Sequence, residues 1–113
     1  MAISRLLEGI YYNNEGVAVT VMSSDEVSKE IRIVFKKGQV MESHMAPFPI
    51  TVMTIQGSIE FGYDSKTTTL NTGDLIKLGA SVMHDLVAKE DSVVLLTLSF
   101  KDTISRVESV QTH

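Results

Sequence analysis

The chain has 113 residues, a formal net charge of −4 and no cysteine. The acidic balance argues against nucleic acid or an anionic membrane surface as a partner, and the lack of cysteine excludes disulfides, zinc–thiolate sites and thiol nucleophiles. A chain of this length is expected to form one domain, residues 1–113, around one core. No apolar run approaches the roughly 20 residues of a membrane helix, and the start lacks a signal-peptide pattern, so we expect a cytoplasmic protein.

Period-two alternation of apolar residues predicts about ten short strands along the chain. We expect them at residues 6–12, 17–22, 30–36, two within 38–57, then 58–63, 67–70, 75–78, 83–88 and 92–100. Polar and glycine-containing turns separate them, which is the pattern of a β-sandwich or barrel. The last segment, residues 101–113, is expected to be a short helix or a frayed, peripheral end.

Residues 38–57 predict a hairpin whose turn is stiffened by two prolines. His44, Ala46, Ile50, Val52 and Thr54 fall on one parity of its two strands, so they share one face. That face is apolar apart from the histidine and a threonine. Such a face indicates a pocket lining or a core position with one polar group.

Residues 73–88 repeat this arrangement further along the chain. Gly73 opens a strand that contains Ile76, a second turn follows, and His84 and Leu86 come on the next strand. Asp85 is adjacent to His84 and therefore points to the opposite face. This placement argues against a Ser-His-Asp triad built on His84.

Together the two runs resemble the cupin family. Its motifs place conserved glycines and histidines at spacings that Gly38, His44, Gly57, Gly73 and His84 match. The resemblance covers roughly the middle half of the chain. It implies an all-β fold, a cupin-like double-stranded β-helix (jelly-roll) barrel.

The departures from the cupin motifs lie at the metal ligands. The resemblance implies three histidines and one glutamate around iron, manganese, nickel, copper or zinc, but Ala46 stands at the second histidine and Ile50 at the carboxylate. In the second motif, Gly79, Ser81 and Ala88 replace proline, glycine and asparagine. His44 and His84 remain as the only ligands of this set.

Two ligands are too few to hold a divalent ion tightly, because each protein ligand replaces a hydration water. We therefore expect no cofactor, and at most a weakly held transition metal. Glu42 shares the parity of His44 and is the one candidate for a further ligand. Met41, Met45 and Met83 have the opposite parity and are expected to face away from the barrel interior.

The sequence leaves three interpretations of the histidine pair: a structural one with hydrogen bonds to each other, to water or to Thr54, contact with an organic ligand, or weak metal binding. We predict a non-catalytic cupin that binds a small organic molecule or acts as an interaction module. The alternative is a metal-dependent oxygenase or isomerase that uses His44 and His84. The expected pocket is lined by His44, Ala46, Ile50, Val52, Thr54, Ile76, His84 and Leu86. A homodimer is also expected, with the apolar residues 6–12 as a candidate contact or exchanged strand.

Overall fold

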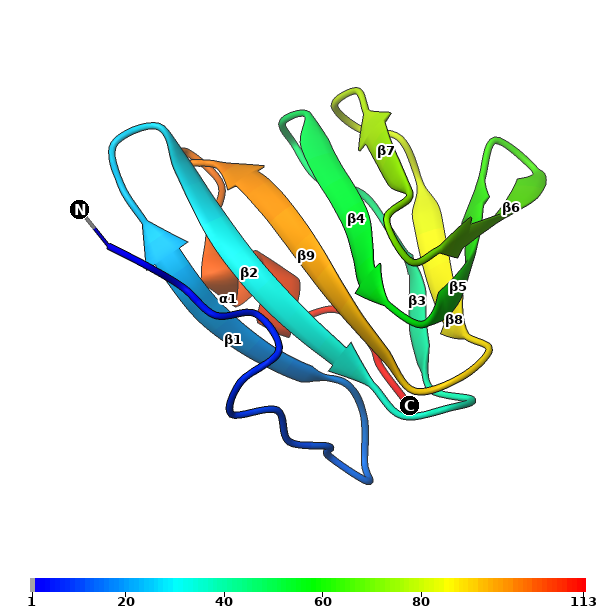
Figure 1. The fold of residues 1–113 in the computed structure, drawn as a ribbon. Helices are drawn as coiled ribbons and strands as arrows, with labels where there is room; N and C mark the ends of the chain where they lie inside the picture. Colours follow the sequence, from blue (N-terminus) through cyan, green and yellow to red (C-terminus); the bar gives the residue numbers. More distant parts are fainter. Residues whose placement is uncertain (1) are drawn as a thin grey trace.

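The computed structural model describes residues 2–113, which form two antiparallel β-sheets packed face to face (Figure 1). The five-stranded sheet has the order β1-β2-β9-β4-β7, and the four-stranded sheet has the order β3-β8-β5-β6. The strands are β1 (Ala18–Ser24), β2 (Ser28–Phe35), β3 (Val40–His44), β4 (Ile50–Gln56), β5 (Ser58–Tyr63), β6 (Lys66–Asn71), β7 (Leu75–Leu78), β8 (His84–Ala88) and β9 (Ser92–Ser99). The predicted all-β double-stranded β-helix is confirmed.

The core lies between the two sheets and explains their sequence pattern. Ile31, Ile33 and Phe35 of β2 alternate inward and are fully or almost fully buried, as are Ile59 and Phe61 of β5 on the facing sheet. β9 is the central strand of the larger sheet and is paired on both edges, with β2 and with β4. Val94, Leu96 and Leu98 face the core, whereas on the opposite face Val93 is buried and Leu95 is half-buried.

The prediction of a first strand at residues 6–12 is wrong. This segment crosses the outside of the larger sheet without joining it (Figure 1). The buried Arg32 guanidinium of β2 donates instead to the carbonyls of Leu6, Glu8 and Gly9, at 3.3, 2.6 and 3.1 Å. Backbone carbonyls near a buried surface require hydrogen-bond partners. In a strand, these three carbonyls would accept from the N–H groups of a neighbouring strand, whereas here they accept from the Arg32 side chain.

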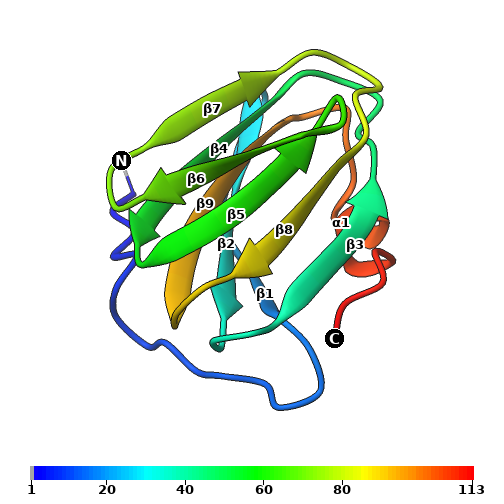
Figure 2. The same ribbon diagram turned by 90° about the vertical axis from the view of Figure 1, so that its right-hand side faces the viewer.

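The C-terminal segment forms the short helix α1 (Ile104–Glu108), capped at its start by the Thr103 side chain, and then pairs with β3 (Figure 2). Val107 of α1 is buried in the core. Val40 exchanges two backbone hydrogen bonds with His113, and the Glu42 N–H donates to the carbonyl of Gln111 at 2.8 Å. This pairing covers the outer edge of β3. At five residues, α1 is the only helix in the described part of the chain, so no helix there is long enough to cross a membrane.

Replacement of Arg32 tests the role of its guanidinium. We expect Arg32→Met to lower the free energy of unfolding by about 2–4 kcal/mol, because three carbonyls lose a charged hydrogen-bond donor. Protease cleavage within residues 2–12 should also become faster. Urea denaturation and limited proteolysis measure the two effects. Arg5→Met is the control, since Arg5 makes only an exposed ion pair with Glu8; equal losses in the two variants would contradict this role.

Candidate functional site

His44 of β3 and His84 of β8 lie directly opposite each other in the smaller sheet. Their rings are 4.2 Å apart between centroids and are tilted by 60°. Side chains at paired positions of antiparallel strands are close neighbours on one face of the sheet, which explains the contact. The structure therefore brings together the two histidines that the sequence places in separate motifs.

Backbone carbonyls fix the protonation pattern of both rings. The Nδ1 atom of His44 lies 2.7 Å from the Glu42 carbonyl oxygen, and that of His84 lies 3.0 Å from the Val82 carbonyl oxygen. A carbonyl oxygen can only accept, so each Nδ1 carries the hydrogen in the neutral ring. Each Nε2 is then left with a free lone pair and can accept a hydrogen bond or ligate an ion.

A small apolar cavity of about 20 Å³ adjoins the two rings. It is lined by Ile33, Met41, His44, Val52, His84, Leu86, Val94 and Leu96. This space is large enough for a group about the size of a water molecule, since that requires at least roughly 10–15 Å³.

Four of the eight residues expected in the pocket line this cavity, namely His44, Val52, His84 and Leu86. Ala46 and Ile50 are buried in the core outside the cavity lining, and Ile76 is half-buried against the core. Thr54 is also fully buried, but its hydroxyl donates to the Leu70 carbonyl at 3.2 Å. The Thr54 hydroxyl therefore does not donate to either histidine, in contrast to what one interpretation of the sequence predicted.

The prediction that Met41 faces away from the barrel interior is wrong. Met41 is only 2% exposed and lines the cavity together with His44, although the two lie three positions apart and so have opposite parity. The β3–β8 register shifts between Met41 and His44, so that three steps along β3 match two along β8. Such a bulge reverses the alternation. Met45 and Met83 are exposed, as predicted.

Glu42 lies within this bulge and does not reach the two rings. Its side chain is exposed, and its Oε1 atom lies 3.0 Å from Nε2 of the exposed tail residue His113. The structure thus places the Glu42 carboxylate beside His113 and away from the histidine pair. Asp85 also lies outside the barrel as expected, where its carboxylate lies against Gly62.

Burial controls the charge of the histidine pair. His84 is 3% exposed and stacks on Phe61 with 5.6 Å between ring centroids. Burial lowers the pKa of His84 to about 4, and it also lowers the pKa of the half-buried His44, because the charged form loses solvation. The hydrogen bonds to the carbonyls oppose this effect, whereas the positive charge of Arg106 adds to it. Both rings are therefore neutral at pH 7.

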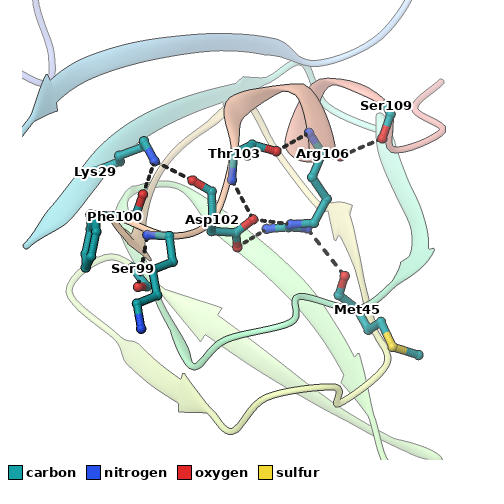
Figure 3. Close-up of polar contacts among 9 residues, drawn as sticks. Lys29, Met45, Ser99, Phe100, Asp102, Thr103, Arg106 and Ser109 are labelled. Carbon is teal, nitrogen blue, oxygen red and sulfur yellow. Dashed lines mark hydrogen bonds and ion pairs between the residues drawn. The ribbon is translucent and has the colours of Figure 1, made fainter.

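The sequence analysis missed Arg106, whose positive charge acts on both histidines; Figure 3 shows its polar contacts. Arg106 extends from α1 and forms a bidentate ion pair with the buried Asp102, with Nε–Oδ1 and Nη2–Oδ2 distances of 2.7 and 2.8 Å. Its Nη1 donates to the carbonyl of Met45, the residue that follows His44, at 3.4 Å. The i, i+4 spacing of Asp102 and Arg106 was the available sequence signal.

The residues present do not fit a tightly bound transition-metal ion. The two imidazoles are the only donors of the expected set that meet, because Ala46 and Ile50 are apolar and Glu42 faces outward. Among residues 2–113, no three histidine, cysteine, aspartate or glutamate side chains cluster as metal ligands. The positive charge of Arg106 near both rings also opposes a cation.

No family model matches this sequence, and no curated protein is significantly similar to it. Its structure is similar to an RmlC-like cupin protein from Desulfovibrio desulfuricans, with a TM-score of 0.81, 22% identity, and 88% of this chain and 96% of that chain covered. It is also similar to KdgF from Halomonas sp., with a TM-score of 0.76, 21% identity, and 89% and 94% covered. A third similar structure is TT1209 from Thermus thermophilus, with a TM-score of 0.80, 18% identity, and 88% and 97% covered. At these identities the likeness establishes a shared fold.

The low pKa of His84 predicts a loss of stability in acid. Between its ordinary pKa near 6.5 and about 4, the unfolded chain binds a proton that the folded chain does not, so the free energy of unfolding falls as the pH falls through this window. We expect His84 to account for a loss of about 2–3 kcal/mol between pH 7 and pH 4.5. Urea denaturation of the wild type and of His84→Gln at both pH values measures this difference. Equal losses in the two proteins would show that His84 does not carry the effect.

Proposed function

We propose that this chain, which has the cupin fold, is a non-catalytic binding protein that holds a small organic molecule through His44 and His84. The observation that carries this proposal is the arrangement of the two rings. Both Nδ1 atoms face backbone carbonyls, so both Nε2 atoms are acceptors beside one small apolar cavity. A ligand group with O–H or N–H hydrogens is the natural partner of such acceptors.

The surroundings of the rings strengthen such a contact. The cavity lining apart from the histidines is aliphatic and thioether, so water competes weakly for the two Nε2 atoms. The interior position of the cavity favours a small molecule over a protein partner at this site. Ligand binding is therefore better supported than a role as a module that binds another protein.

The alternative of a metal-dependent oxygenase or isomerase has less support. It needs further ligands beside His44 and His84, and Glu42 is turned outward toward His113. Loss of a single outer-shell partner typically costs on the order of 10–100-fold in metal affinity, so the loss of two direct ligands should cost at least as much. We accordingly propose that no divalent ion is tightly held.

Calorimetric titration and histidine NMR test the proposed function together. We expect no stoichiometric micromolar binding of Fe²⁺, Ni²⁺, Cu²⁺ or Zn²⁺ to untagged protein, and no bound metal by elemental analysis. We expect 1,2-propanediol to shift the Hε1 resonances of His44 and His84, and His84→Gln to weaken its binding at least 10-fold. Stoichiometric metal binding that disappears in His44→Ala would reject the proposal. Unchanged Hε1 resonances at saturating diol would also reject it.

We further propose that the protein acts in the cytoplasm as a homodimer. Residues 6–12 remain the candidate contact, since Leu7, Tyr11 and Tyr12 are exposed. An exchange of this segment between subunits is not favoured, because Arg32 binds it to the sheet of its own chain. The contact would then be made by the outward side chains of a segment already folded onto the larger sheet.

Light scattering after size-exclusion chromatography tests the dimer. We expect a mass of about twice the 12.4 kDa chain at a protein concentration of about 50 μM. Leu7→Glu should give the monomer mass, because a charge then lies in an apolar contact. Val27→Glu is the control, since Val27 is also apolar and is more exposed than Leu7, but lies in the turn between β1 and β2. A monomer mass for the wild type would contradict the proposal.

A further inference from the structure

We propose that the ligand of this site is a hydroxy carboxylate, with its hydroxyl group in the cavity beside His84 and its carboxylate paired with Arg106. The inference rests on the proposed function, because it uses the same two imidazoles. It adds a third residue to the site and a chemical class to the ligand.

The size of the cavity limits which part of a ligand enters it. About 20 Å³ accommodates one hydroxyl group, but not a carboxylate or a carbon chain. The Nε2 atom of the buried His84 accepts the hydroxyl hydrogen. The rest of the ligand must then lie outside the cavity, and His44 is the more exposed of the two histidines.

Arg106 lies close enough to both histidines for its charge to lower their pKa values, although it does not line the cavity. Its Nη1 atom reaches the carbonyl of Met45, which directly follows His44, and Figure 3 shows the guanidinium between Asp102 and Met45. A guanidinium has five N–H hydrogens. Asp102 accepts two of them and Met45 accepts one, so two remain for a further acceptor. A carboxylate is the acceptor that matches a guanidinium best in geometry and charge.

The guanidinium is held in place before any ligand arrives. Asp102 is 2% exposed, and its carboxylate also accepts the Thr103 N–H at 2.8 Å. Lys29 on β2 donates to the carbonyls of Phe100 and Asp102, which fixes the segment before α1 to the larger sheet. A donor fixed in this way loses little conformational entropy when it binds a ligand.

Electrostatics at the two rings favour an anion over a cation. Among the charged residues that influence His44 and His84, Arg106 acts more strongly than Asp85, whose carboxylate lies on the outer face of the sheet. The positive charge of Arg106 therefore outweighs the negative charge of Asp85 at the rings, although Asp102 is paired with the guanidinium. A hydroxyl group alone would gain nothing from this charge, whereas a carboxylate on the same molecule would.

Three matched three-carbon probes separate the two halves of the inference: lactate, propionate and 1,2-propanediol. Titrations followed by the Hε1 resonances of the histidines give each affinity. We expect lactate to bind wild-type protein at least 10-fold more tightly than either other probe. Arg106→Gln should reduce the affinity for lactate to that for propanediol. Arg106→Lys keeps the charge and should retain the preference for lactate, with thermal denaturation as the test that α1 stays folded.

The outcomes distinguish this inference from the proposed function. Equal binding of lactate and propanediol by the wild type would overturn the role of Arg106 while the proposed function stands. Equal binding of lactate and propionate would overturn the role of the hydroxyl group. A loss of the lactate preference in Arg106→Lys, at an unchanged melting temperature, would also overturn it. Failure of all three probes to bind would reject the proposed function itself.

Discussion

The antiparallel pairing of β3 with β8 is the constraint on which the candidate site depends. It places His44 opposite His84, and the bulge in β3 lets both His44 and Met41 point into the barrel. Without the extra residue, strict alternation would turn one of these two side chains outward. The pair of rings, the lining of the cavity and the outward position of Glu42 all follow from this one local irregularity.

The chemistry of the site follows from what surrounds the pair. Aliphatic neighbours and Phe61 keep the rings neutral, and two backbone carbonyls turn their lone pairs away from the strands. The same rings in a shell of carboxylates would be prepared for a divalent ion. In an apolar shell with an arginine nearby, the rings of His44 and His84 favour hydrogen-bond donors that carry no positive charge.

Much of the fold could be predicted from the sequence, because alternation and turn residues act locally. The histidine pair could also be predicted, since the spacing of glycines and histidines matches two motifs of a known family. Met41 could not be placed by parity, because a bulge changes the count, although the consecutive polar residues Glu42 and Ser43 were a sign of it. Residues 6–12 were predicted as a strand because the segment itself is apolar. Their structure is decided by the contact with Arg32, which is distant in the sequence and leaves no local pattern. Arg106 was missed for the same reason: its position beside the pair depends on how the tail packs.

The pairing of residues 111–113 with β3 has a consequence for synthesis on the ribosome. β9, which joins β2 to β4, and the tail that covers β3 are the last parts described here to leave the exit tunnel. Until then β2 and β4 lack their shared neighbour, and β3 has an open edge that another nascent chain could pair with. The strand that bears His44 therefore keeps an exposed edge until residues 111–113 have emerged, although its other edge can pair with β8 before that.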